Sequence, residues 1–218
     1  MTRLFLIDYG INVPETVSMK AEYFPGDFSK TEVRQEGYVI PFGDGPKPIY
    51  NRRVGQTVIR NMLAGATKYA YITTPYLIID NELCVAIETA ALRGVNVKII
   101  TPHIPDKKTV FAMTRSFYPR LMAAGVEIYE YTPGFIHAKS YLVDDEIAMV
   151  GTINLDYRSL VHHFENGVWL YGGEAIGALK EDMEDTLSKS MRIMEDMLKT
   201  DWISRAMRAL VRIFSPLL

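Results

Sequence analysis

The sequence predicts an α/β domain with a mixed, mostly parallel central sheet and helices on both faces. Two observations support this fold class. Segments with helical spacing alternate with short apolar segments typical of strands, which is the order of βαβ units. The chain has 218 residues, 48% of them hydrophobic, which is enough to bury a core without disulfides or metal. Its one cysteine, Cys84, lies in an apolar helical stretch and is expected to be a buried structural thiol.

The regular elements are expected to begin after residue 36. Residues 1–36 carry neither a motif nor a strong periodicity, so they are interpreted as a linker or the tail of a preceding domain, and the domain is assigned to 37–218. A strand at 38–42 and a turn at Gly43–Pro46 come first. Three helix–strand units are then expected, at 54–68 with 69–73, at 81–93 with 95–101, and at 108–124 with 126–131.

Two glycines, Gly94 and Gly125, directly follow predicted helices and are the expected C-terminal caps. The later segments are predicted to be strands at 136–142 and 147–150, a short helix at 156–163, a strand at 167–171 and a long, charged helical tail from Glu174. The first two of these strands are expected at or near the centre of the sheet, because they connect the motif described next.

The chemistry is predicted to lie in one stretch, residues 135–154. Within it His137, Lys139 and Asp144 have HxKxxxxD spacing. If the residues around the histidine are extended, His137, Lys139 and Tyr141 emerge on one face. A neutral imidazole beside an ammonium suits attack on phosphorus, since the imidazole is the nucleophile and the charge stabilises the oxygens in the transition state.

A second element, Gly151 to Asn154, has the pattern GTxN and follows the apolar run at 147–150. Thr152 and Asn154 could donate hydrogen bonds to the same phosphoryl oxygens if the two strands are adjacent. The alternative is a solvated strand with scattered polar residues, because a motif is a hypothesis until its structural context is known.

Three segments, HAKSYLVDD, GTINLDYRS and the later FE, resemble the HKD motif of the phospholipase D superfamily. In detail they are similar to the second catalytic half of bacterial cardiolipin synthases. The likeness covers about residues 37–218 and includes Thr73–Tyr76, Ala90–Val95, Gly125–Tyr131 and Ser215–Leu218. It implies a phospholipase D-like fold and phosphatidyl transfer.

The resemblance also implies roles for individual residues. His137 would form the covalent phosphohistidine or act as acid and base, and Lys139 and Asn154 would bind phosphate. Glu165 matches a downstream acid that orients the catalytic imidazole. The motif's Asp144 is interpreted as structural.

Other positions complete the predicted pocket. Thr152 stands where the superfamily has a small hydroxyl residue. Tyr76 and His103 follow strands at their carboxyl ends, where open α/β sheets bind ligands. His103 is expected either to line the pocket or to be a surface histidine with satisfied hydrogen bonds. His163 stands where the family usually has Asn, which affects the expected pocket or acceptor preference.

The mechanism that the resemblance implies needs two histidines, one to attack phosphorus and one to protonate the leaving alcohol. None of His103, His162 and His163 begins a second HxK pattern. A homodimer or a second HKD-containing half is therefore expected to complete the site. The family usually begins with membrane spans, so the chain is interpreted as a half.

By resemblance, the reaction is cardiolipin synthesis from two phosphatidylglycerols with release of glycerol. Water in place of the lipid hydroxyl would make the same site a phospholipase D. Two alternatives stay open: a homodimeric phosphodiesterase or nuclease of the same superfamily, and a non-catalytic half that pairs with a catalytic partner.

The net charge of −2, from 24 basic and 26 acidic residues, argues against non-specific nucleic-acid binding. No metal-ligand spacing occurs, so no metal or cofactor is expected. The expected partners are a phospholipid substrate, a membrane surface and the second HKD-containing half or copy.

The last segment, residues 202–214, has an amphipathic helical pattern with several arginines. It is expected to lie on an anionic membrane surface or to pack on the body or a partner subunit. No apolar run reaches 18 residues, so no transmembrane segment is predicted. The resemblance implies a peripheral location at the cytoplasmic face of the bacterial membrane.

Overall fold

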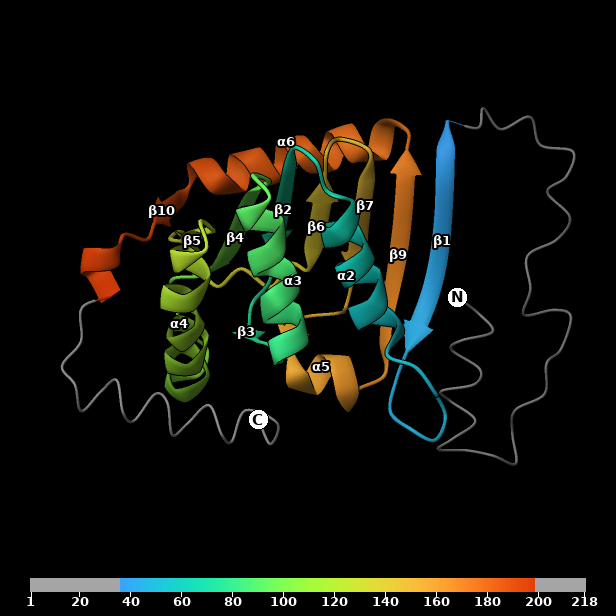
Figure 1. The fold of residues 1–218 in the computed structure, drawn as a ribbon, viewed down its shortest axis with the longest axis horizontal. Coiled ribbons are helices and arrows are strands. Elements are labelled where there is room, and N and C mark those ends of the chain that lie inside the picture. Colours follow the sequence, from blue (N-terminus) through green and yellow to red (C-terminus); the bar gives the residue numbers. More distant parts are fainter. Residues whose placement is uncertain (1–35, 199–218) are drawn as a thin grey trace, which may run out of the picture.

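Each predicted helix–strand unit is present in the computed structural model, which describes residues 36–198 (Figure 1). The predicted linker, apart from Glu36, and the amphipathic segment at 202–214 lie outside the described residues. The strands are β1 (Gly37–Asp44), β2 (Tyr69–Thr73), β3 (Leu77–Ile78), β4 (Asn96–Pro102), β5 (Glu127–Tyr131), β6 (Ser140–Val143), β7 (Ile147–Gly151), β8 (Leu155–Asp156), β9 (Glu165–Gly172) and β10 (Ser190–Arg192). The helices are α2 (Val54–Gly65), α3 (Asn81–Leu92), α4 (Lys108–Ala123), α5 (Tyr157–Val161) and α6 (Glu174–Ser188), with a 3-10 turn at Glu195–Leu198.

The main sheet has the strand order β1-β9-β7-β6-β2-β4-β5-β10. The predicted α/β class with a mixed sheet is confirmed, but the mostly parallel character is wrong. Only β2, β4 and β5 pair in parallel, and the other neighbours in this described sheet are antiparallel. The connections explain the difference, because α3 and α4 carry the chain between the parallel strands whereas β6 and β7 form a hairpin.

Helices cover both faces of the sheet, as the sequence predicts. α2, α3 and α4 lie on one face and α6 on the other (Figure 1). Neighbouring residues of β6 point to opposite faces, so Tyr141 is buried in the larger core with Leu83 of α3. Leu142 packs on the other face with Ile176 and Met183 of α6. The two central motif strands are thus held from both sides.

Gly94 and Gly125 end α3 and α4 as predicted. Both adopt a left-handed backbone, with φ of +93° and +95°. A side chain at either position would be strained, which is why glycine is the residue that follows these helices.

The helical tail that the sequence predicts from Glu174 is shorter than expected. α6 ends at Ser188, and β10 then pairs antiparallel with β5 at the edge of the sheet. The chain leaves the helix because Ile193 is buried in the larger core and Met191 packs against it. This edge strand is not predicted by the helical periodicity alone.

A second, two-stranded sheet of β3 and β8 is also absent from the prediction. In it, Leu77 pairs with Leu155. Beside it, the backbone N–H of Leu155 donates to the Thr74 hydroxyl over 3.0 Å. These contacts tie the loop that follows β2 to the loop that follows β7, and both loops contribute to the site.

Asp144 joins the β6–β7 turn to the start of β2. Its carboxylate accepts hydrogen bonds of 2.7–2.8 Å from the backbone N–H groups of Thr67, Lys68 and Tyr69 and from the Thr67 hydroxyl. Burial disfavours the charged carboxylate, but these donors hold the pKa of Asp144 below its usual range. Asp144 lies at the end of β6 away from His137, where its contacts are with the backbone of the fold.

We expect Asp144→Asn to lower the free energy of unfolding by about 2–3 kcal/mol at neutral pH, because an amide nitrogen would face backbone donors. The folded-state pKa is depressed, so this stabilisation is present above the unfolded-state pKa of about 3.9 and is lost as pH falls through the folded-state pKa. Urea unfolding of both proteins at neutral pH and at about pH 3 measures their free energies of unfolding, and the difference between the two proteins should be smaller at the lower pH.

The matched control is Asp145→Asn. Asp145 shares the left-handed backbone, with φ of +61° against +54° at Asp144. Its carboxylate is exposed, pairs with Lys180 and accepts from the Tyr69 hydroxyl, a bond that the amide oxygen of Asn can keep. An exposed ion pair is worth less than about 1 kcal/mol. Equal losses at the two positions would show that the turn does not depend on the buried carboxylate.

Candidate active site

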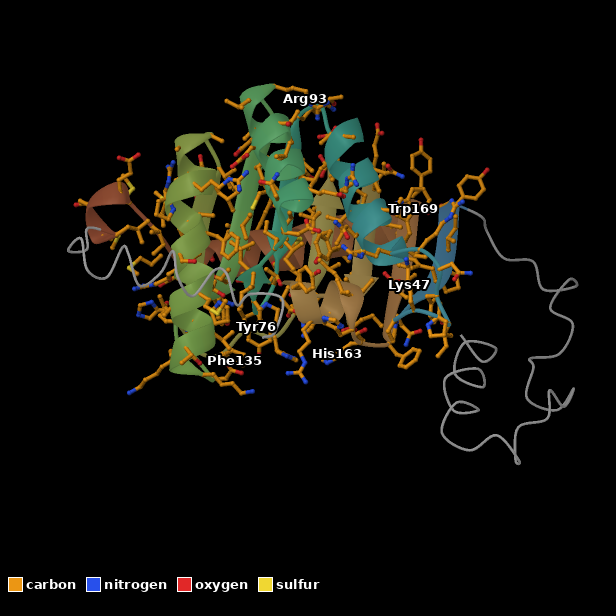
Figure 2. All side chains as sticks on the ribbon, turned by 60° about the horizontal axis from the view of Figure 1, so that its bottom comes forward. Lys47, Tyr76, Arg93, Phe135, His163 and Trp169 are labelled. Atoms are coloured by element: carbon orange, nitrogen blue, oxygen red, sulfur yellow. The ribbon has the colours of Figure 1, made fainter. Side chains whose placement is uncertain are left out.

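The candidate site lies at one end of the main sheet, formed by the ends of its strands and called the site edge below. There β1, β2, β4, β5 and β7 end and β6 and β9 begin. Figure 2 brings this edge forward and shows Tyr76, Phe135 and His163 there, whereas Arg93 lies at the opposite end of the molecule. Antiparallel pairing of β6 with β7 sets Ser140 opposite Val150. The residues just before β6 are therefore close to those just after β7, as the sequence predicts.

His137 and Lys139 are in direct contact. Lys139 Nζ lies 3.0 Å from His137 Nδ1 and donates to the His137 carbonyl oxygen over 2.6 Å. The strand begins only at Ser140, so the predicted strand at 136–142 is shorter at its start. His137 is nevertheless exposed to solvent and Lys139 half-buried, so both can reach a substrate at this edge.

The surroundings of the pair favour a neutral imidazole. Burial and then the Lys139 ammonium lower the pKa of His137, while Asp106 raises it. For Lys139, burial lowers the pKa, and Glu165 and Asp156 raise it. A histidine whose pKa lies below the usual value is uncharged at neutral pH and has a lone pair for attack.

The GTxN element is built by a close approach of β7 to β9. A side-chain Cβ at Gly151 would lie 2.2 Å from the carbonyl oxygen of Asn166, so only glycine fits there. The Thr152 N–H donates to that same carbonyl over 2.9 Å. The Thr152 hydroxyl accepts from the Asn166 N–H and donates to Glu165.

Glu165 is buried and is held by hydroxyl groups. Thr152 and Ser159 both donate to its carboxylate, the latter over 2.6 Å. No hydrogen bond joins Glu165 to His137 within residues 36–198. The predicted orienting role of Glu165 toward an imidazole therefore stays a prediction.

Asn154 belongs to the same group of hydrogen-bonded residues around Ser159 and Glu165. Its backbone N–H donates to the Ser159 hydroxyl over 3.0 Å, and its side chain hydrogen-bonds Asp156. The Asn154 Oδ1 is buried and has no hydrogen-bond partner among the described residues. An unsatisfied buried acceptor is costly, so a ligand or a neighbouring domain that donates here would be stabilised.

Asp156 and Ser159 are site residues that the sequence analysis did not single out. Asp156 caps α5 by accepting from the Ser159 N–H over 2.6 Å, and its burial raises its pKa. The available signal was the spacing of Asp and Ser three residues apart before an apolar pair, which is typical of a helix start. α5 thus fixes the Ser159 hydroxyl that holds Glu165.

The ring of Phe135 lies between Tyr76 and His137. The Tyr76 and Phe135 ring centroids are 6.5 Å apart, and those of Phe135 and His137 are 5.7 Å apart. The Tyr76 hydroxyl donates to Asp106 over 2.6 Å, so its pKa is raised by burial and by that carboxylate. Asp106 was not predicted, because it lies in a loop without periodicity.

His103, the other predicted pocket residue, is held by a buried carboxylate. Its Nδ1 lies 2.8 Å from Glu130, which is fully buried and also takes two hydrogen bonds from Arg115. His103 therefore has a hydrogen-bond partner, and its predicted place in the pocket stays a prediction. No contact between His103 and the His137–Lys139 pair is seen in the described part of the chain.

Neither a metal site nor a membrane span is found within residues 36–198. No group of three or more His, Cys, Asp and Glu side chains there could hold a metal ion. Likewise, none of the helices in this part of the chain has both the length and the apolar character to cross a bilayer.

Solved structures share this fold. Nuc from Salmonella typhimurium, a phospholipase D family member, superposes with a TM-score of 0.60 at 17% identity, covering 73% of this chain and 100% of that one. Phosphatidylserine synthase from Haemophilus influenzae superposes with a TM-score of 0.61 at 18% identity, covering 82% of this chain and 45% of that one. The fold is that of the phospholipase D superfamily.

Sequence comparison narrows the class. Residues 59–187 match the family described as the cardiolipin synthase, PLD-like domain. The chain is 35% identical over 216 residues to a cardiolipin synthase of Halalkalibacterium halodurans, covering 99% of this chain and 42% of that protein. It is 42% identical over 158 residues to cardiolipin synthase 2 of Bacillus anthracis, covering 72% of this chain and 31% of that protein.

The chain therefore belongs to the cardiolipin synthase family of phospholipase D-like domains. It is also 47% identical over 188 residues to an uncharacterized protein of Streptococcus mutans, covering 86% of this chain and 40% of that protein. Across these three relatives the chain spans 31% to 42% of their length.

The protonation of His137 can be measured directly by an NMR titration of its imidazole in this chain. We expect a midpoint below the ordinary value of 6.5, because burial and Lys139 both disfavour the charged ring. Lys139→Met should move the midpoint upward, since it removes a neighbouring positive charge.

The control for this titration is Lys98→Met, on β4, where the ammonium lies 4.9 Å from the Tyr71 ring centroid. It should leave the His137 midpoint unchanged. A wild-type midpoint at or above 6.5, or a fall on Lys139→Met, would contradict the electrostatics described for the pair.

Proposed function

We propose that this domain carries one half of a phosphatidyltransferase site that makes cardiolipin from two phosphatidylglycerols through a phosphohistidine. The observation that carries the proposal is the contact between His137 and Lys139 at the open edge of the sheet, in a chain of the cardiolipin synthase family. A nucleophilic nitrogen and a fixed cation are the two groups that displacement at a phosphodiester needs.

The chemistry proceeds in two displacements. In the first, one imidazole nitrogen attacks phosphorus, the bond from phosphorus to the headgroup glycerol oxygen breaks, and a second histidine gives a proton to the departing glycerol. In the second, a hydroxyl of another phosphatidylglycerol gives its proton to that second histidine and attacks phosphorus, which breaks the phosphorus–nitrogen bond. The products are glycerol and cardiolipin, and both histidines return to their starting states.

The contact between Lys139 and His137 corresponds to the resting state of the histidine, before it attacks phosphorus. Because Lys139 donates to Nδ1 of His137, the neutral ring carries its proton on Nε2. Attack by Nε2 requires the other tautomer, in which Nδ1 holds the proton and donates it to an acceptor. Lys139 must therefore turn toward the phosphate, and a carboxylate must accept a hydrogen bond from Nδ1–H. Glu165 is the carboxylate that we propose for this role, from this chain or from the second half.

The second histidine must come from outside the single HxK pattern of this chain. Since the chain spans at most 42% of the three relatives compared above, a second HKD-containing half has room in proteins of that length. A symmetric pair of copies would supply the same groups. In either case the two motifs face each other across the edge where His137 is exposed.

The proposed substrates are lipids, so we also propose that this edge meets a membrane surface, on the cytoplasmic face of the bacterial membrane as the family resemblance implies. The exposed apolar side chains of Phe135 and Phe164 lie around the site and would contact lipid. No nucleic-acid partner is proposed, because the chain carries a net charge of −2.

The test pairs the molar mass of the purified chain in solution with a turnover assay on phosphatidylglycerol vesicles. The assay is run on the chain alone and with a second HKD-containing half added. We expect His137→Ala to abolish formation of cardiolipin and glycerol, and Lys139→Met to slow it about 10²–10³-fold, because stabilisation of the transferring phosphoryl group is lost.

Lys98→Met is the control and should turn over at the wild-type rate. An active dimer would show that two copies complete one site, and an inactive monomer that regains activity with the added half would show that a second motif is required. Release of phosphatidic acid instead of cardiolipin would mean that water is the acceptor. Turnover by His137→Ala at the wild-type rate would refute the site.

A further inference from the structure

Arg158 and His163 form a hydrogen-bonded pair at the rim of the candidate site. Arg158 belongs to α5, and His163 follows that helix. Arg158 Nε donates to His163 Nε2 over 2.8 Å. Because Nε2 accepts this bond, the neutral ring carries its proton on Nδ1, which lies 3.9 Å from the Glu165 carboxylate. His163 thus links the guanidinium to Glu165 and restricts its position.

The charge of this guanidinium is not neutralised within the part of the chain that the structure describes. Arg158 is exposed, and no carboxylate of residues 36–198 forms an ion pair with it. Asp156 is engaged with the Ser159 N–H, and Glu165 accepts from two hydroxyls. Nε uses one of the five N–H donors of an arginine, and both terminal nitrogens remain for a ligand.

The pair lies at the same edge as the nucleophile. Figure 2 shows His163 and Phe135 at the same end of the sheet, and the Phe135 ring packs against that of His137. Glu165, which His163 faces, is near enough to Lys139 to raise its pKa. Glu165 is therefore close both to Lys139 and to the Arg158–His163 pair, and each of these two cations can hold an anion of its own.

The proposed reaction brings two anions to this edge. The donor phosphodiester is the one that the His137 nitrogen attacks and that Lys139 stabilises. The acceptor phosphatidylglycerol carries a second phosphodiester, whose charge would repel the first unless a separate cation holds it. Arginine suits this task, because its planar fork of donors matches two phosphate oxygens.

We propose that Arg158 binds the phosphodiester anion of the acceptor lipid, and that His163 is a positioning residue that holds the guanidinium toward it. This inference rests on the proposed function, since an acceptor lipid exists only in the transfer reaction.

The binding experiment uses sn-glycero-3-phosphoglycerol, the deacylated headgroup, with the chain in a His137→Ala background so that no turnover occurs. Calorimetry should give a Kd that is about tenfold or more weaker for Arg158→Gln, as expected for the loss of a charge-assisted hydrogen bond. Arg60→Gln is the matched control: Arg60 is an exposed arginine of α2, paired with Glu82, and its loss should leave the Kd unchanged.

The positioning role of His163 is tested by two substitutions in the same assay. His163→Asn keeps an acceptor for the arginine Nε and should keep the Kd within about twofold, whereas His163→Leu removes the acceptor and should weaken binding toward the Arg158→Gln value. Equal effects of Asn and Leu would show that His163 does not act by holding Arg158.

The turnover experiment measures the ratio of cardiolipin to phosphatidic acid made from phosphatidylglycerol, with the second half added. Arg158→Gln should lower this ratio about tenfold, because the acceptor lipid is lost while water still resolves the phosphohistidine. A variant that slows both products equally would refute an acceptor role.

The two experiments separate the subsite from the proposed function. Binding that depends on Arg158, in a protein that makes no cardiolipin under any condition, would support the anion subsite and reject the proposed reaction. Cardiolipin formation with an unchanged product ratio in Arg158→Gln would support the reaction and reject the subsite. Inorganic phosphate that binds as tightly as the diester, with the same dependence on Arg158, would assign the site to free phosphate and overturn the acceptor proposal.

Discussion

The site depends on one buried interaction at the far end of the motif hairpin, where the Asp144 carboxylate accepts from the start of β2. β6 contributes only four residues to the sheet, and a short strand can slip in register. A slip by one residue would exchange Tyr141, which belongs to the larger core, with Leu142, which faces α6. Four hydrogen bonds to one carboxylate prevent that slip, and so they fix where His137 and Lys139 emerge from the sheet.

Behind the exposed pair, the site is organised by buried polar groups that satisfy one another. Glu165 takes two hydroxyl donors, one from the GTxN element and one from Ser159 of α5. Ser159 is placed in turn by Asp156, which caps the helix and carries a pKa raised by burial. A network of this kind is rigid when every member is paired, and the buried Asn154 Oδ1 is its one unpaired side-chain atom among the described residues. Among the described residues, the network is complete except at Asn154 Oδ1.

The sequence predicts most helices and strands because their periodicities are local. The spacing of two residues between His137 and Lys139 also predicts neighbouring side chains, although the strand assumed for them begins only at Ser140. The sequence does not predict the elements whose positions depend on pairing between distant strands. The antiparallel return of β7 against β9 and the two-residue strands of β3 and β8 have no periodic signal. β10 follows a helix whose charged pattern continues in the sequence, so its position becomes clear only from the burial of Ile193. Asp106 lies in a loop, where the sequence has no periodicity from which its place at the site could be predicted.

The distribution of charge at this edge suggests why the fold separates its two cations. Lys139 is partly desolvated, and its charge is supported by Glu165 and Asp156. A second free cation placed directly beside it would disfavour both charges and lower the pKa of His137 further, until the imidazole lost basicity that it needs as an acid or a base. Glu165, a buried carboxylate close to both Lys139 and His163, offsets that repulsion. Under the proposed function, Lys139 would then hold the donor phosphodiester and Arg158 the acceptor phosphodiester, with a second histidine supplied by the other half.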